Sequence, residues 1–473
     1  MRRTFLIGAL LGVLLDGTHG SAQSPASEAS LATTLGAVLD QRAIAGARVA
    51  VMVAAADSGR VLFAASEDLA MNPASNAKLL TAAAALSILG PSRAFETTVW
   101  GRLEGDAVSS LALRGGGDPA LRARDLDALA AELASRGVTR VTGGLLLDDT
   151  LYGGESLPPG FEQQPGEDAA YRPSVSALAV DAAAITVTVR ADPRAPRCVA
   201  TASPPESAVV VSAAEVHESA APVLRVAPLA DGRARIEVGG RCAARPSVVA
   251  RRQLHPTAVA GAVFRRALSR YGITVDGDDR VGATPGGLEQ LAIHRSQPLS
   301  ALLYEAGKHS NNFTAEMIFL ATGGGPRGFA SAAERVRAWA SSQGVPTLGM
   351  QVRNGSGLYD SDRLSARQLV HVLRAAWGNP ALRHEFVAQL ATAGEDGTLA
   401  RRLSARPARG VVRAKTGTLN DVIALSGYAL GPTPARTLVF SVLINGARGH
   451  TQEARRLVDE LALAIARWNP ARR

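Results

Sequence analysis

Five strand-like segments of this chain stand near its two ends, and most of its length lies between them. Residues 47–66 form two β-prone runs around the turn Asp57-Ser58-Gly59. Three more runs, separated by short turns, cover residues 410–418, 422–430 and 437–445. We expect these five runs to pair in one five-stranded antiparallel sheet, because each needs neighbours to bury its apolar face. That sheet requires both ends of the chain to fold together.

Helical patterns accompany these runs and predict an α+β fold. An apolar helix is expected over residues 75–89, where Gly90-Pro91 stops it. Residues 298–390 are largely helical, and residues 451–468 have apolar residues at helical spacing. We expect the terminal helices on one face of the sheet and the 298–390 helices on the other.

The middle of the chain differs in residue composition from the two ends, which indicates an insertion. Glycine and proline punctuate short β-prone segments such as residues 184–189. We therefore expect smaller β-rich domains inserted into the main one. The predicted division is a signal peptide at 1–22, a main domain at 23–95 with 291–473, and an inserted region at 96–290, itself split into about 96–180 with 255–290, and 181–254.

The charge of the chain argues against nucleic-acid binding. Its net charge is +9, but 51 basic residues are interleaved with 42 acidic ones. Arginine doublets such as Arg251-Arg252 and Arg401-Arg402 are scattered, and no basic run is long enough to follow a phosphate backbone. We expect no nucleic-acid partner, and the excess positive charge suits an anionic polymer.

The N-terminus has the pattern of a secretory signal peptide. Arg2 and Arg3 precede an apolar run at residues 5–15, and Gly20-Ser21-Ala22 supplies the small residues that signal peptidase reads. We expect cleavage after Ala22 and a periplasmic or secreted protein, the alternative being an uncleaved membrane anchor. No later segment reaches about 18 uninterrupted apolar residues, so we expect at most peripheral association with a membrane.

Two cysteines, Cys198 and Cys242, lie in the inserted region. An oxidising compartment lets them pair, and closing that loop would stabilise the segment by about 4 kcal/mol. With no histidine pair nearby they make a poor metal site, so we expect a disulfide and no bound metal. A reactive thiol is the less favoured alternative.

Lysine is rare in this chain and arginine is common. Among the 51 basic residues the lysines are Lys78, Lys308 and Lys415. Arginine cannot lose its proton in a protein, whereas the lysine amine can. A lysine that persists in such a chain therefore indicates a site that needs a compact amine able to lose its proton, unless the three are chance leftovers.

The first lysine follows a serine by one helical turn. Ser75 and Lys78 stand at the start of the apolar helix, where Ser75 can cap the helix and both side chains share a face. The positive end of the helix dipole favours a serine alkoxide and disfavours protonation of the amine. The pair can therefore act as a nucleophile with a lysine base, although an ordinary cap explains most such pairs.

The other two lysines open polar segments of their own. Lys308 precedes Ser310 and Asn312 at a helix junction, where the hydroxyl can relay a proton and the carboxamide can hold a substrate amide. Lys415-Thr416-Gly417-Thr418 ends a strand, whose edge can pair with an extended peptide while Gly417 leaves room for close approach. A cap and a hairpin lysine are the alternatives. All three lysines fall in such segments, and this coincidence favours catalysis.

These three segments resemble the signatures of the penicillin-recognising serine enzymes, Ser-x-x-Lys, Ser-x-Asn and Lys-Thr-Gly in that order. Ser310 follows Ser75 by 235 residues. That interval resembles the D-Ala-D-Ala carboxypeptidase/endopeptidase family S13, the class C low-molecular-mass penicillin-binding proteins, which carry inserted domains there. Further similar segments are Gly117-Asp118-Pro119-Ala120-Leu121, Asn354-Gly355-Ser356-Gly357-Leu358 and Gly397-Thr398-Leu399.

The resemblance implies a penicillin-binding transpeptidase-like domain and a serine DD-peptidase that cleaves peptidoglycan stem peptides. It implies no cofactor, and β-lactams as covalent inhibitors. It implies that Ser75 is the nucleophile, that Lys78 is the base, and that Ser310 relays the proton to the departing D-alanine. Asn312 would hold the amide of the acyl donor, and Lys415 with Thr416 and Thr418 would bind the terminal carboxylate. The backbone N–H groups of Ser75 and Thr418 would form the oxyanion hole.

The resemblance is weakest where the side chains of a stem peptide would be read. Tyr359-Asp360 stands where family members often have Ser-Arg, and residues 160–164 replace a segment usually rich in tryptophan. A β-lactamase or esterase on the same scaffold, and a non-catalytic peptidoglycan-binding protein, are the alternative functions. The sequence leaves carboxypeptidase and endopeptidase action undistinguished.

Overall fold

The computed structural model describes residues 25–41, 44–216, 221–243 and 245–468. The predicted signal peptide therefore lies outside the described residues. The helices are α1 (Pro25–Gln41), α2 (Ala77–Leu89), α3 (Ala123–Ser135), α4 (Pro256–Arg270), α5 (Leu299–Gly307), α6 (Asn312–Gly323), α7 (Gly328–Ser342), α8 (Ala366–Gly378), α9 (Pro380–Ala388) and α10 (Thr451–Trp468). The strands are β1 (Arg48–Ala55), β2 (Val61–Ala65), β3 (Glu96–Glu104), β4 (Ala107–Arg114), β5 (Arg140–Thr142), β6 (Leu146–Asp148), β7 (Ala184–Ala191), β8 (Cys198–Ser203), β9 (Ala208–Ser212), β10 (Glu215–Val216), β11 (Pro222–Pro228), β12 (Ala234–Cys242), β13 (Ser247–Arg252), β14 (Thr274–Val275), β15 (Arg280–Val281), β16 (Glu289–Arg295), β17 (Ala391–Thr392), β18 (Val412–Thr418), β19 (Val422–Ala429) and β20 (Leu438–Asn445).

A central antiparallel sheet joins the two ends of the chain, in the order β17-β18-β19-β20-β1-β2. The contact between the ends is a full ladder, in which Arg48 faces Asn445 and Ala55 faces Leu438. All five strands expected from the sequence are present. The sheet has six strands rather than five because β17 adds a two-residue edge, which is too short to leave a hydrophobic pattern.

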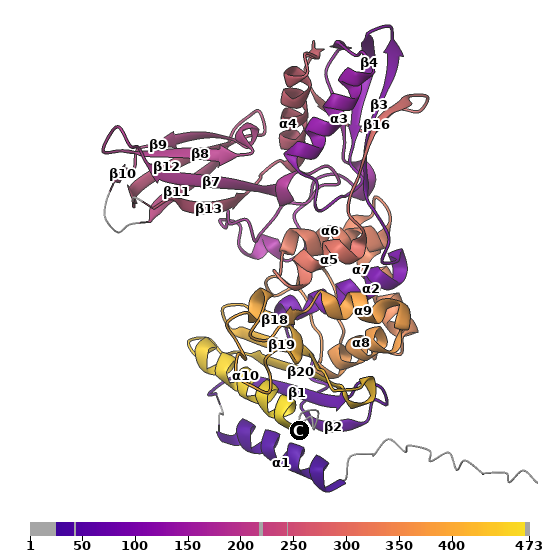
Figure 1. Ribbon diagram of the computed structural model, residues 1–473, viewed down its shortest axis with the longest axis vertical. Helices are drawn as coiled ribbons and strands as arrows, with labels where there is room; N and C mark the ends of the chain where they lie inside the picture. The colour runs from indigo at the N-terminus through magenta and orange to yellow at the C-terminus, as the bar shows by residue number, and fades with distance from the viewer. Residues whose placement is uncertain (1–24, 42–43, 217–220, 244, 469–473) are drawn as a thin grey trace, which may run out of the picture.

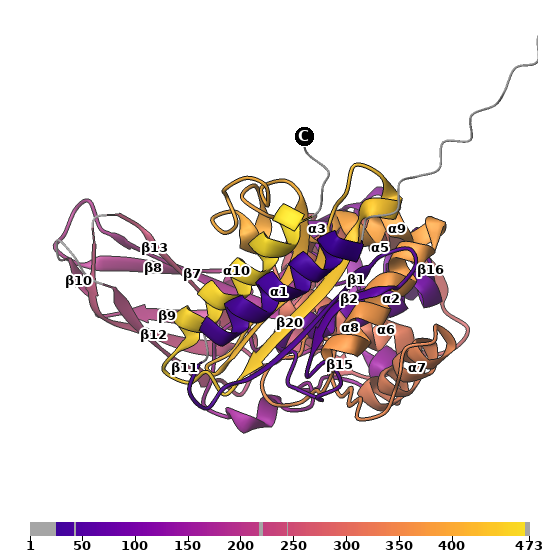
Figure 2. The same ribbon diagram turned by 90° about the horizontal axis from the view of Figure 1, so that it is seen from below.

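Helices cover both faces of this sheet. Alternate residues of β1 point to opposite sides, so Met52 joins the core beneath α2, α5, α6 and α8, while Val51 joins the core beneath α1 and α10. Figure 2 shows α1 and α10 running side by side across one face. The helix expected at 75–89 forms α2, but it packs with the 298–390 helices and not with α10. The helix beside α10 is α1, which no sequence pattern had indicated.

The inserted region forms two further bodies (Figure 1). In the first, a sheet in the order β14-β5-β4-β3-β16, with β6 and β15 attached, packs against α3 and α4. These two helices were not anticipated in a stretch expected to be β-rich. The second body projects to the left in Figure 1 and packs the sheet β13-β7-β8 against the sheet of β9 to β12. Cys198 and Cys242 form a disulfide in its core.

Across the described residues, no helix combines the length and the apolar character needed to cross a membrane.

Candidate active site

Ser75 lies on a short 3-10 turn, η1 (Ala74–Asn76), that leads into α2. The alternative in which Ser75 merely caps the helix does not apply, because the N-cap of α2 is Asn76 and the Ser75 side chain makes no capping hydrogen bond. Ala74 has a left-handed φ of 46°, a conformation that costs free energy in a non-glycine residue. The backbone N–H of Ala74 donates a hydrogen bond to Asn72 Oδ1 at 2.9 Å. The turn thereby leaves the Ser75 hydroxyl free for chemistry.

Lys78 lies beneath Ser75 and is almost fully buried. Its Nζ is 3.0 Å from Ser75 Oγ, 2.7 Å from Asn312 Oδ1 and 2.9 Å from the carbonyl oxygen of Ser356. Burial lowers the pKa of Lys78 to about 7, since the charged amine loses its hydration. A substantial fraction of this amine is therefore neutral at physiological pH.

Two buried carboxylates lie behind the lysine and were not anticipated from the sequence. Glu316 accepts hydrogen bonds from the N–H groups of Gly355 and Ser356, at 2.7 and 3.0 Å, and so shapes the turn that faces Lys78. Burial raises the pKa of Glu316, and it raises the pKa of Asp362 to about 7. Both carboxylates raise the pKa of Lys78 and partly offset its burial. In the sequence, the available sign of a buried carboxylate was Glu316 itself, a single charged residue within the apolar helix α6.

Ser310 and Lys415 form the second hydroxyl–amine pair of the site. Ser310 adopts a left-handed φ of 57° between α5 and α6, and its Oγ accepts a hydrogen bond from Lys415 Nζ at 2.8 Å. Asn311, not Ser310, caps α6, by accepting from the Thr314 N–H at 3.0 Å. Burial, and secondarily the charge of Lys78, lowers the pKa of Lys415.

Strand β18 borders the cleft with an open edge. Among the described strands, β17 pairs with β18 at Arg413 and Ala414, which leaves the outer edge from Lys415 to Thr418 without a strand partner. The Thr416 hydroxyl bonds to the Thr398 hydroxyl at 2.8 Å.

Gly417 admits a neighbour that the sequence did not predict. A Cβ there would lie 3.0 Å from both Asn76 Nδ2 and the Pro73 carbonyl. Its missing side chain thus makes room for the turn that carries Ser75.

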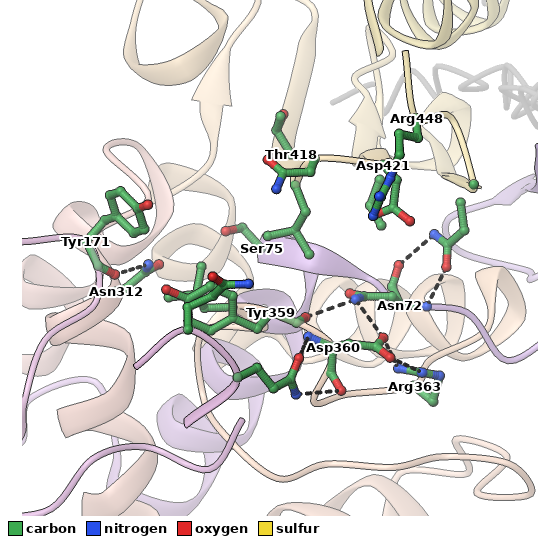
Figure 3. Close-up of a pocket in the computed structure, with 18 of the residues that line it drawn as sticks. Asn72, Ser75, Tyr171, Asn312, Tyr359, Asp360, Arg363, Thr418, Asp421 and Arg448 are labelled. Carbon is green, nitrogen blue, oxygen red and sulfur yellow. Dashed lines mark hydrogen bonds and ion pairs between the residues drawn. The ribbon is translucent and has the colours of Figure 1, made fainter. Parts of the chain in front are cut away.

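Asn312 opens α6 and connects the cleft to the inserted region. Its Nδ2 donates to the carbonyl oxygen of Tyr171 at 2.6 Å, as Figure 3 shows. Ser75, Ser310, Asn312 and Thr418 all line one cavity of about 950 Å³. Its remaining walls come from 163–171, 358–363, 419–422 and 445–448, together with Arg48 and Asn72.

The rarity of lysine had suggested that Lys308, like the other two lysines, serves a site that needs an amine able to lose its proton. The structure gives its side chain a different place. Its side chain is buried and forms an ion pair with Asp396, and its Nζ is 3.5 Å from Thr392 Oγ1. The ammonium faces the segment that carries Thr398 rather than the Ser75 cavity. This lysine supports the cleft from behind, because its backbone carbonyl also accepts from the Thr398 N–H at 3.0 Å.

The structure thus joins Ser75, Lys78 and Asn312 by direct hydrogen bonds and Ser310 to Lys415 by another. Ser75, Ser310 and Asn312 of these two groups line the same cavity. Thr416, Gly417 and Thr418 follow along the adjoining strand edge. In the part of the chain that the structure describes, no cluster of histidine, cysteine, aspartate or glutamate has the composition of a metal site.

Comparison with known proteins gives a consistent result. Residues 31–467 match the D-Ala-D-Ala carboxypeptidase 3 (S13) family. A D-alanyl-D-alanine carboxypeptidase of Actinomadura sp. (strain R39) is 35% identical over 456 residues, covering 91% of this chain and 84% of that protein. Carboxypeptidase DacB of Mycolicibacterium smegmatis is 31% identical over 432 residues, covering 87% and 78%. The crystal structure of penicillin binding protein 4 (dacB) from Haemophilus influenzae superposes with a TM-score of 0.78 at 23% identity, covering 90% of this chain and 99% of that one.

Proposed function

The chain belongs to the D-Ala-D-Ala carboxypeptidase 3 (S13) family, and we propose that it cleaves D-Ala-D-Ala-type bonds of peptidoglycan stem peptides through an acyl-enzyme on Ser75. The enzyme is a serine peptidase and is penicillin-sensitive. Carboxypeptidase and endopeptidase action use the same acylation chemistry and differ in what lies beyond the bond that is cut.

The observation that carries this proposal is the hydrogen-bond pattern of Lys78. A neutral amine has two N–H donors and one lone pair. The Asn312 Oδ1 atom and the Ser356 carbonyl can only accept, so they take both donors. The lone pair is left for the Ser75 hydroxyl at 3.0 Å. Lys78 can therefore remove the Ser75 proton as the oxygen attacks.

The reaction then proceeds in two halves. Ser75 Oγ bonds to the carbonyl carbon of the penultimate D-alanine, and its proton passes to Lys78. Ser310, held by Lys415, gives its proton to the nitrogen of the departing D-alanine as the C–N bond breaks, and it takes up in return the proton that Lys78 removed from Ser75. Water next attacks the ester and releases the shortened peptide, regenerating the Ser75 hydroxyl.

The surrounding groups hold the substrate in register. The open edge of β18 can pair with an extended stem peptide, and the second Nδ2 hydrogen of Asn312 can bond the acyl donor's amide carbonyl. Lys415, Thr416 and Thr418 take the terminal carboxylate; the Thr416 O–H, which donates to Thr398 Oγ1 at 2.8 Å, turns from that partner to the carboxylate when substrate binds. The N–H groups of Ser75 and Thr418 form the oxyanion hole, worth about 3 kcal/mol per donor.

We further propose a periplasmic or secreted location, after removal of residues 1–22, and a main domain of 23–95 with 291–473 interrupted by the inserted region 96–290. The Cys198–Cys242 disulfide fits an oxidising compartment. The first inserted sheet and the projecting sheets each have a hydrophobic core of their own, which supports the division. The central core also includes Tyr152, Val175, Ala177, Ala179 and Ala183, so this part of the inserted region packs on the main domain.

Labelling with fluorescent penicillin tests the proposal. We expect a persistent covalent adduct on the purified protein that disappears in Ser75→Ala, and release of D-alanine from peptidoglycan fragments by mass spectrometry. Severed cross-linked dimers would instead reveal endopeptidase action. Rapid nitrocefin turnover without an adduct would favour a β-lactamase, and binding to sacculi without labelling or release would favour a non-catalytic protein.

A further inference from the structure

Arg172 is a buried cation whose hydrogen bonds go to backbone carbonyls. Its side chain is 1% exposed, and it belongs to the roof loop, which we define as residues 158–172. Nε and Nη2 donate to the Phe161 carbonyl at 3.0 and 2.7 Å, and Nη1 donates to the Glu167 carbonyl at 3.1 Å. The guanidinium therefore draws both ends of a turn in the roof loop together.

The residue before it, Tyr171, contacts the acylation machinery through its backbone. The Tyr171 carbonyl accepts from Asn312 Nδ2 at 2.6 Å. Because a carbonyl can only accept, it fixes which end of the Asn312 amide faces the roof loop, and the Oδ1 end must then face Lys78. That orientation is the one that leaves the lysine lone pair for Ser75.

The opposite orientation of the amide would defeat this arrangement. If the Asn312 side chain turned by 180°, its NH2 group would face Lys78 Nζ and would need the lysine lone pair as its acceptor. The Ser75 hydroxyl would then have lost its base. The position of one backbone carbonyl in the inserted region thus decides whether the base is available.

From this geometry we propose that Arg172 is a positioning residue for acylation: it holds the roof loop so that the Tyr171 carbonyl orients the Asn312 amide. The proposal rests on the proposed function of Ser75 and Lys78. Arg172 itself touches neither of them.

The far side of the roof loop is fastened to the projecting body, so Arg172 works within a loop clamped at two places. The Asp168 carbonyl accepts from the Arg252 N–H at 2.9 Å, and the Asp168 carboxylate lies 3.2 Å from Arg251 Nε. Ala169 forms an antiparallel bridge with Arg251 on β13. The projecting sheets thereby anchor a loop whose other side forms a wall of the active site.

A double-mutant cycle tests the proposal. Arg172→Met removes three hydrogen bonds, and its acylation rate constant with fluorescent penicillin is compared in two backgrounds, wild type and Asn312→Ala. We expect a loss of about 10- to 100-fold in the wild-type background, since a misplaced catalytic contact costs about that much, and no further loss once Asn312 is absent. Arg265→Met is the control, because Arg265 also holds a loop of the inserted region through the carbonyls of Val275 and Gly277, and it forms an ion pair with Asp279 as well.

Each outcome decides the matter. Equal losses in both backgrounds, or no loss in either, would overturn the positioning role. An equal loss in Arg265→Met would show that any loosening of the inserted region suffices, and would also overturn it. If Arg172→Met fails to fold, Arg172→Lys keeps the buried cation and is put through the same cycle. Absence of labelling in the wild type would instead refute the proposed function.

Discussion

Acylation of Ser75 is expected to depend on pH through the protonation of Lys78. Burial lowers the pKa of this amine to about 7, whereas an ordinary lysine titrates near about 10.4. At pH 7 roughly half of the amine is then neutral, compared with about one molecule in 2,500 at the ordinary pKa. The lowered pKa therefore increases the available base about a thousandfold.

In the proposed mechanism the neutral amine is the active form, so we expect the rate to rise with pH. Between pH 5 and pH 9 the neutral fraction increases from about 1% to about 99%, which predicts a rise of about 100-fold in the acylation rate constant. The assay is stopped-flow labelling with fluorescent penicillin at constant ionic strength. A flat profile over this range, or a midpoint near 10, would refute the assignment of Lys78 as the base.

Asp362→Asn identifies the group that titrates. The pKa of the Asp362 carboxyl is also raised to about 7, and its negative charge raises the pKa of Lys78. If Lys78 is the base, this variant keeps the acidic limb of the profile but moves it to lower pH. If the acidic limb disappeared in this variant, the titrating group would be Asp362 and not Lys78.

Two further perturbations test the scaffold. Gly357→Ala places a Cβ 2.0 Å from the Ala74 carbonyl. We expect slower acylation and a decrease in the free energy of unfolding of about 1–3 kcal/mol or more. The control is Gly344→Ala, which has the same φ of +71° but open space around it, and equal effects of the two variants in urea unfolding would contradict this reasoning. Replacing both Cys198 and Cys242 by alanine should destabilise the projecting sheets by about 4 kcal/mol, and unchanged hydrogen exchange in those sheets would count against it.

The central sheet was predictable because its strands are long, apolar and bounded by turn residues. The two-residue strand β17 and the helix α1 carry weaker patterns. The helix α3, in contrast, was predictable, because its buried residues Leu126, Leu129, Ala130 and Leu133 follow helical spacing. It was missed because the glycines and prolines around it had indicated a β-rich stretch.

The cleft was predictable from residue types and not from geometry. Ser75 and Lys78 were identified by their spacing, yet the 3-10 turn that frees Ser75 from capping depends on the strained backbone of Ala74. Lys308 shows the limit of composition, since a rare lysine can equally serve a buried ion pair. The Tyr171 carbonyl leaves no trace in the sequence at all, because every residue has one.

The ladder between β3 and β16 has a consequence for how the chain folds. Strand β1 must wait for β20, which is synthesised far later, so the central sheet has a high contact order and is expected to form slowly. The inserted body, however, pairs Glu96 with Arg295, the points where the chain leaves and re-enters the central body. Once that body has formed, it holds the two ends of the insertion together and so shortens the effective loop between the N-terminal and C-terminal parts of the central sheet. We therefore expect amide protection to appear first in the insertion and last in β1 and β20.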